Sequence, residues 1–391
     1  MLQSRTHLVR LFMMLLVSIV LLAHGTAAAQ GGDIVVGDGT PASCTETALR
    51  QALAVASASG GGTIRFDCGS DPLAISLIET AEVRDIGPIL IVAPDGTTID
   101  GGGVITLAGL ANGIVLFVAP ETAAAVLRSV TVTHRGTLFP TVHNQGTLTI
   151  TNSAVSDNRS GGGIVNDGTL TITGSTIARN GSFLRGGITN SGRLTLNDSV
   201  VSGNRGFAGG GLVNDDVNAD ARIAGSTFLD NAAEGDGGIS NSGSLSIKDS
   251  EFVNNRGIFG DGAIGNAGRL DVKHSTFGQN LARQGGAGGI GNGGTASVAD
   301  SEFSMNAGGF GAAISHTGGT LTIKKSDFSG NRALISGGGI YNCAGTVDIK
   351  HSTITGNSAG QQGGGIYTCA GSTTTLKDTL VRDNTPDDFA P

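Results

Sequence analysis

A repeat of 22 to 27 residues is the feature of this sequence that most constrains its fold. Ten units align on an aliphatic residue preceded by small residues, and they begin at Val142, Ile164, Ile188, Leu212, Ile239, Ile264, Ile290, Ile314, Ile340 and Ile366. Asparagine stands two residues after this position in eight of the ten units, and His316 and Thr368 replace it in the other two. A period of this length is typical of a solenoid, in which each repeat packs on its neighbours.

The second half of each unit has its own pattern. An apolar position there is phenylalanine in five consecutive units: Phe228, Phe252, Phe277, Phe303 and Phe328. Asparagine follows three residues after this position in every unit: Asn158, Asn180, Asn204, Asn231, Asn255, Asn280, Asn306, Asn331, Asn357 and Asn384. We expect each column to form a ladder, with ring stacked on ring and each amide hydrogen-bonded to the next.

The local pattern within a unit is that of strands. Segments such as 146–150 and 168–172, both Gly-Thr-Leu-Thr-Ile, alternate polar and apolar residues and are rich in β-branched side chains, while glycine clusters punctuate them as turns. The sequence therefore predicts an all-β protein, a parallel β-helix of about 12–13 coils stacked ~4.8 Å apart, with a short N-terminal capping helix.

The chain divides into four predicted segments. Residues 1–29 have the basic start, short apolar run and small-residue end of a signal peptide, which predicts an exported protein with no membrane span after cleavage. Residues 30–70 form a cap, in which Cys44–Val55 is predicted as a helix with Ser43 and Glu46 at capping-box spacing. Residues 71–141 are irregular coils, and 142–391 are the regular repeats.

Four cysteines form two candidate disulfides. Cys343 and Cys369 occupy equivalent positions on adjacent coils, where the coil spacing suits a disulfide. Cys44 and Cys68 would tie the predicted helix to the first strand. An even cysteine count in an exported chain favours both bonds.

Composition narrows the class of function. The net charge of −8 becomes −10 without Arg5 and Arg10, which argues against a nucleic-acid binder. The chain has 66 glycines, no tryptophan and two tyrosines. Because sugar rings usually pack on aromatic faces, the scarcity of tyrosine and tryptophan argues against a glycan ligand.

The repeats resemble a known family. Phe-x-x-Asn occurs in five units beside Gly-Gly-Ile or Gly-Ala-Ile segments such as 262–264, and this pairing resembles the repeats of polymorphic outer-membrane proteins and, more broadly, the right-handed β-helices of the pectin-lyase-like superfamily. The resemblance covers Val142 to Asn384. It implies a right-handed β-helix and, for this repeat type, adhesion at the cell surface. The superfamily also contains enzymes, so the resemblance alone does not decide function.

No catalytic, cofactor-binding or metal-ligating residue is predicted. The acids near the turns, namely Asp167, Asp215, Asp216, Asp236 and Asp261, are explained as turn-forming residues, and their spacing matches no calcium loop. The histidines His134, His143, His274, His316 and His351 are scattered over distant coils, and His316 is interpreted as a substitute within an asparagine column.

Two surface features are candidates for binding. Five lysines share one outward position on successive coils, namely Lys248, Lys273, Lys324, Lys350 and Lys377; they face either an anionic glycan or the neighbouring acids Glu251, Glu302 and Asp327. The segments after each second-half asparagine vary between units, as at 205–208, 256–259 and 332–335, and such loops either carry recognition in solenoids or drift freely.

The leading hypothesis is a secreted or surface-associated, non-enzymatic β-helix that binds a glycan or a protein of a host or neighbouring cell. Periplasmic location is the alternative to secretion. A polysaccharide lyase or glycoside hydrolase with its site between Gly96 and Gly146 is the second hypothesis, and a structural spacer is the third.

Overall fold

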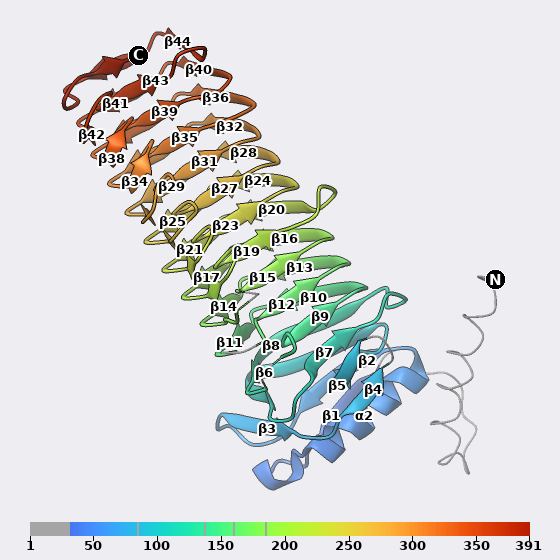
Figure 1. Ribbon diagram of the computed structural model, residues 1–391. Helices are drawn as coiled ribbons and strands as arrows, with labels where there is room; N and C mark the ends of the chain where they lie inside the picture. The colour runs from blue at the N-terminus through green and yellow to red at the C-terminus, as the bar shows by residue number, and fades with distance from the viewer. Residues whose placement is uncertain (1–31, 84–85, 137, 159–160, 184–185) are drawn as a thin grey trace. The chain divides into compact units, whose positions relative to one another are not determined.

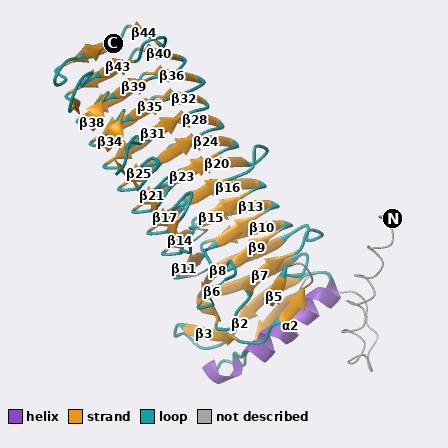
Figure 2. Ribbon diagram, viewed as in Figure 1, coloured by secondary structure: helices purple, strands orange, loops and turns teal. Residues whose placement is uncertain are grey.

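The computed structural model describes residues 32–83, 86–136, 138–158, 161–183 and 186–391. The predicted signal peptide lies outside the described residues. From residue 32 onward the chain winds into a right-handed parallel β-helix of about 12 coils, as the repeat predicts. Figure 1 shows the coils stacked in chain order, and Figure 2 shows that they consist of strands and loops, with a helix at the N-terminal end of the stack.

Each regular coil has two strands in a 25-stranded sheet, which we call sheet A. Short strands begin this sheet, two long strands that run along both rows follow them, and each regular coil then contributes a five-residue and a three-residue strand. Its first row contains β1 (Asp33–Val36), β2 (Gly62–Phe66), β6 (Thr97–Gly109), β8 (Ala125–His134), β10 (Thr147–Thr151), β13 (Thr169–Thr173), β16 (Arg193–Asn197), β20 (Asp220–Ala224), β24 (Ser244–Lys248), β28 (Arg269–Lys273), β32 (Thr295–Ala299), β36 (Thr320–Lys324), β40 (Thr346–Lys350) and β44 (Thr373–Lys377). Its second row adds β3 (Leu73–Leu77), β11 (Ala154–Ser156), β14 (Thr176–Ala178), β17 (Val200–Ser202), β21 (Thr227–Leu229), β25 (Glu251–Val253), β29 (Thr276–Gly278), β33 (Glu302–Ser304), β37 (Asp327–Ser329), β41 (Thr353–Thr355) and β45 (Leu380–Arg382).

Two further sheets complete the coils. Sheet B has 14 strands: β4 (Ala81–Val83), β5 (Gly87–Val92), β7 (Ile114–Val118), β9 (Val142–Asn144), β12 (Ile164–Asn166), β15 (Ile188–Asn190), β19 (Leu212–Asn214), β23 (Ile239–Asn241), β27 (Ile264–Asn266), β31 (Ile290–Asn292), β35 (Ile314–His316), β39 (Ile340–Asn342), β43 (Ile366–Thr368) and β46 (Phe389–Ala390). Sheet C has seven: β18 (Arg205–Gly206), β22 (Ala232–Ala233), β26 (Arg256–Gly257), β30 (Leu281–Ala282), β34 (Ala307–Phe310), β38 (Arg332–Ser336) and β42 (Ser358–Ala359). All described pairings are parallel except β4 with β5.

The predicted ladders fill the interior. The five phenylalanines are fully buried and stack with ring centroids 4.6–4.9 Å apart and interplanar angles of 2–11°. Amides donate to amides along both asparagine columns, for example Asn255 Nδ2 to Asn280 Oδ1 at 3.0 Å and Asn241 Nδ2 to Asn266 Oδ1 at 2.7 Å. His316 accepts the Asn292 amide at 2.9 Å, which confirms it as a ladder substitute, and its burial lowers its pKa.

The N-terminal cap contains a short 3₁₀ helix, η1 (Pro41–Ser43), and helix α2 (Glu46–Ser59). Helix α2 buries one apolar face, made of Leu49, Ala52, Leu53 and Ala56, against the first coils. It ends at Ser59, and Gly60 follows as the C-cap with a φ of 73° that suits glycine.

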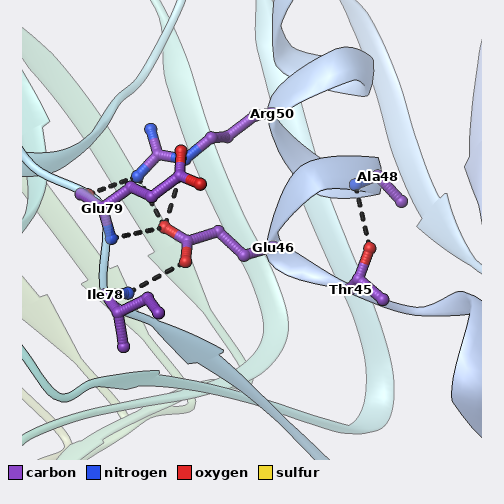
Figure 3. Close-up of polar contacts among 6 residues, drawn as sticks. All are labelled: Thr45, Glu46, Ala48, Arg50, Ile78 and Glu79. Carbon is purple, nitrogen blue, oxygen red and sulfur yellow. Dashed lines mark hydrogen bonds and ion pairs between the residues drawn. The ribbon is translucent and has the colours of Figure 1, made fainter.

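The predicted capping box is wrong by two residues. Thr45 is the N-cap, because its hydroxyl accepts the Ala48 N–H at 3.2 Å (Figure 3). The Glu46 carboxylate accepts the N–H groups of Ile78 and Glu79 at 2.9 and 3.1 Å instead of folding back on the cap. The Arg50 guanidinium completes this cluster at 2.6 Å from Glu46, so that the cap is joined to the segment after β3.

Both predicted disulfides are present. Cys44–Cys68 has a Cα–Cα distance of 5.8 Å, and Cys343–Cys369 has one of 4.6 Å. The first joins the cap to the segment after β2, and the second joins two adjacent coils, as expected from their equivalent positions.

Candidate functional site

The outer face of sheet B carries the candidate site. In β23, β27 and β31 the first and third residues are buried, and the middle residue points away from the core. This outward column runs His143, Val165, Thr189, Val213, Ser240, Gly265, Gly291, Ser315, Tyr341 and Tyr367. Unlike the buried columns, it changes residue type from coil to coil, which is expected of a surface that is not fixed by packing.

A cleft of about 450 Å³, which we call cleft 1, lies on this face over β23, β27, β31 and β35. Two carboxylates, Asp236 and Asp261, lie in its lining on adjacent coils, each three residues before a buried isoleucine. Polar groups dominate the rest of the described lining: Ser240, Asn241, Ser242, Asn266, Gln284, Ser315 and Thr317, together with Phe259, Ala267 and six glycines.

Glycines make room for the two carboxylates. A Cβ on Gly265 would lie 2.2 Å from Asp236 Oδ2, and a Cβ on Gly291 would lie 1.9 Å from Asp261 Oδ2. In the described strands of the regular repeats, the outward position of sheet B is glycine only at these two coils. Each aspartate side chain therefore lies over the glycine of the next coil. The glycine is needed where the aspartate is present, because any larger residue would collide with the carboxylate.

The environment of these acids favours their protonated forms. Burial raises the pKa of Asp236, opposed in part by the Asp261 N–H, which donates to Oδ1 at 2.9 Å, and by a hydrogen bond with Ser240. Burial, followed by the charge of Asp236, raises the pKa of Asp261 well above its usual range. The Ala287 N–H, 2.7 Å from Asp261 Oδ1, opposes this rise only in part. The two carboxyl groups share one small site and cannot ionise independently.

A second cleft of about 390 Å³, cleft 2, lies on the same face nearer the N-terminus. It is lined by His143, Val165, Asp167, Thr189, Ser191, Ala208, Val213 and Asp215. His143 Nε2 lies 2.8 Å from Asp167 Oδ2, and the imidazole contacts the Phe117 ring edge-on with centroids 5.7 Å apart. His143 is thus held by one acid and one ring at the end of the cleft.

Aromatic residues gather on the same face. The two tyrosines of the chain, Tyr341 and Tyr367, stack there with centroids 5.4 Å apart, and Phe310 lies 4.9 Å from Tyr341. Phe207 and Phe259 come from the variable loops predicted as binding candidates, and they are 47% and 65% exposed. Although aromatic residues are scarce in the composition, the fold concentrates several of them beside the clefts.

The lysine column is aligned as predicted but lies on sheet A, outside both clefts. Lys248, Lys273, Lys324, Lys350 and Lys377 share one register position along β24, β28, β36, β40 and β44, with Ala299 between the second and third. Three of these lysines form ion pairs with neighbours on their own coils: Lys248 with Asp249, Lys273 with Asp271 and Lys350 with Asp348. These partners differ from the acids expected from the sequence, because Glu251, Glu302 and Asp327 lie in the second row of sheet A.

The acids of cleft 1 were assigned to turns by sequence reasoning, and no catalytic residue was predicted. Asp236 and Asp261 lie in the segments that precede β23 and β27, and Asp236 forms a parallel bridge with Gly209. A signal was present in the sequence: aspartate replaces the usual small residue in two adjacent units, and glycine replaces the outward residue one unit later in each case. Cleft 1 also lies beyond the Gly96–Gly146 region to which the enzyme hypothesis assigned its site. Within the described ranges, no three His, Cys, Asp or Glu side chains converge as a metal site requires.

From residue 32 onward, the described part of the chain has the fold of a parallel β-solenoid. No protein-family model matches the chain, and no curated protein matches it either. Among solved structures it is similar to the catalytic unit of a thermostable GH87 α-1,3-glucanase from Streptomyces thermodiastaticus strain HF3-3, with a TM-score of 0.53 and 14% sequence identity. The match covers 93% of this chain and 71% of the glucanase unit. At this identity the similarity establishes the fold and leaves the chemistry to the site itself. None of the described helices has the length and apolarity needed to cross a membrane.

Proposed function

We propose that this protein is an exported glycoside hydrolase that cleaves a polysaccharide in cleft 1, with Asp236 and Asp261 as its two carboxylates. The observation that carries the proposal is the pair itself: two acids on adjacent coils, placed over glycines in a polar cleft and coupled through their charges. Glycosidases typically use two carboxyl groups that flank the scissile bond.

The two acids divide the roles as a pair. Burial raises the pKa of both, so together they retain a proton that a free carboxyl group would lose; the protonated member is the general acid that protonates the leaving oxygen, and the ionised member is the nucleophile. Equivalent positions on adjacent coils lie ~4.8 Å apart, which is close to the ~5–5.5 Å carboxyl separation of retaining enzymes. The expected outcome is hydrolysis with retention of the anomeric configuration.

Two other observations support this proposal. The glucanase unit with a similar fold is itself a glycoside hydrolase, so a β-helix of this shape can carry the reaction. The two disulfides fit a protein that works in an oxidising compartment, in agreement with the signal peptide expected at residues 1–29. Membership of the pectin-lyase-like superfamily is part of the same proposal.

One specific observation favours the alternative of a non-catalytic binding or adhesion protein. Each carboxylate accepts a backbone N–H from the next coil, Asp236 from Asp261 and Asp261 from Ala287, as a structural aspartate that joins adjacent coils would. Under this alternative, the aromatic residues beside the clefts would bind a glycan without cleaving it.

Release of new reducing ends from neutral and acidic polysaccharides by the purified protein tests the proposal. We expect Asp261→Asn and Asp236→Asn each to lower the rate by at least ~10²-fold, the usual contribution of a positioned acid or base. Asp230→Asn is the matched control, because Asp230 is exposed outside both clefts and its φ of 56° suits asparagine. If no polysaccharide in the panel is shortened, or if all three variants are equally active, the proposal is wrong and the binding alternative stands.

A further inference from the structure

The two clefts meet on the outer face of sheet B. Val213, which lines cleft 2, pairs in register with Ser240, which lines cleft 1, because β19 and β23 are adjacent strands. No coil therefore separates the two hollows. Together they extend from the coil of His143 to the coil of Ser315, which is seven coil steps or roughly 34 Å at ~4.8 Å per step. A groove of this length exceeds what a single reacting bond requires.

The lining suits an uncharged ligand rich in hydroxyl groups. Serine and threonine hydroxyls and asparagine and glutamine amides contribute donors and acceptors along the groove. Of the described residues that line the two clefts, none is lysine or arginine, whereas four are aspartates: Asp167, Asp215, Asp236 and Asp261. A polymer of uronic acids would meet acidic side chains in both clefts, and neither described lining offers a lysine or arginine to compensate its charge.

Exposed aromatic rings stand beside both parts of the groove. Phe259 lines cleft 1 and is 65% exposed. Phe207 precedes Ala208 of the cleft 2 lining and lies 5.8 Å, centroid to centroid, from the still more exposed Phe183. Rings left in water on a protein with so few aromatic residues mark a binding surface, because their burial against a ligand is favourable.

We infer that clefts 1 and 2 form one continuous groove for a neutral polysaccharide, which lies along the stack with several sugar residues bound at once. The inference rests on the proposed function only in assigning the reacting bond to cleft 1. Phe259 then contacts the sugars beside the carboxylates, and Phe207 contacts sugars several residues away, above cleft 2. A chain bound along such a groove would be cut internally.

Binding measurements on the Asp261→Asn variant, which cannot turn over a substrate under the proposed mechanism, test this inference. The neutral probes are α-1,3-glucan, laminarin and mannan, and the acidic probes are polygalacturonate and alginate. Co-sedimentation identifies the bound neutral polymer, and calorimetry then compares a disaccharide with a heptasaccharide of the same linkage. We expect a neutral probe to bind and the acidic probes to bind at least roughly tenfold more weakly.

Second-site variants on the Asp261→Asn background separate the two parts of the groove. We expect Phe259→Ala to weaken binding of both oligosaccharides, and Phe207→Ala to weaken the heptasaccharide roughly tenfold while leaving the disaccharide unchanged. Met305→Ala is the matched control, because Met305 is 58% exposed and lines neither cleft. Thermal unfolding of each variant confirms that the fold is retained.

Three outcomes would overturn the inference: acidic probes bound as tightly as neutral ones, no probe bound at all, or Phe207→Ala indistinguishable from Met305→Ala on the heptasaccharide. Failure of the proposed hydrolysis is a separate result. If the neutral polymer binds as expected but the unsubstituted protein never shortens it, the inference of a continuous binding groove is retained. The catalytic roles proposed for Asp236 and Asp261 are then wrong.

Discussion

Alanine in place of Gly291 should disable cleft 1 without unfolding the solenoid. The added Cβ would lie 1.9 Å from Oδ2 and 2.3 Å from Cγ of Asp261. Ordinary contact begins at about 3.4 Å, so the carboxyl group must retreat by about 1.5 Å. Gly291 has no positive φ, and alanine is therefore compatible with its backbone.

The size of the effect follows from this displacement. Misplacement of a catalytic group by ~1 Å can lower a rate ~10²-fold, so we expect a fall in kcat/KM of at least that size. The retreat also breaks the 2.7 Å hydrogen bond from the Ala287 N–H to Asp261 Oδ1. Because the side chain can swing outward into the cleft, we expect only a small change in melting temperature.

Gly293→Ala is the matched control on the same face. A Cβ there meets its nearest atoms at 3.8 and 3.9 Å, which is ordinary contact. The assay compares polysaccharide hydrolysis and thermal unfolding of the two variants with those of the unsubstituted protein. If Gly291→Ala retains the activity of Gly293→Ala, the carboxylate over Gly291 has no part in the reaction, and the argument from the glycine pair fails.

Three further predictions concern stability. The pKa of Asp261 is raised in the folded state, so ionisation of this side chain destabilises the fold as the pH rises above 3.8, the ordinary pKa of aspartate. The Asp261→Asn variant should therefore have a higher melting temperature than the unsubstituted protein at pH ~7. At pH ~3 the melting temperatures should show no such gain. Phe277→Ala should lower the free energy of unfolding, measured by chemical denaturation, by ~3–5 kcal/mol. Phe228→Ala should lower it by about 0.5–1.5 kcal/mol less, because Phe277 stacks on two rings and Phe228 on one. Equal losses would argue against ring stacking as the cause. Replacement of Cys44 and Cys68 by serine should lower the free energy of unfolding by roughly 3 kcal/mol, as expected for a closed loop with a sequence separation of 24, and an unchanged denaturation midpoint would contradict this.

The repeat made the interior predictable. A residue type that recurs once per coil must meet its own kind above and below, so the phenylalanine stack, both asparagine ladders and the Cys343–Cys369 bond follow from alignment alone. Local choices near the ends were less certain. Ser43 and Thr45 both suit an N-cap; in the fold Thr45 caps the helix, while the Ser43 hydroxyl donates to the carbonyl of Thr40.

The candidate site depended on geometry that no linear pattern states. In sequence, Asp236 and Asp261 are two turn aspartates 25 residues apart, and Gly265 and Gly291 are two glycines among 66. Winding the chain places each acid over the glycine of the following coil, where removal from water raises both pKa values and the charge of Asp236 raises that of Asp261 further. The sequence by itself determined the solenoid and its ladders, because stacking depends on period. Only the tertiary structure decided which outward residues share a cleft, because burial and charge coupling depend on distances in space between different coils.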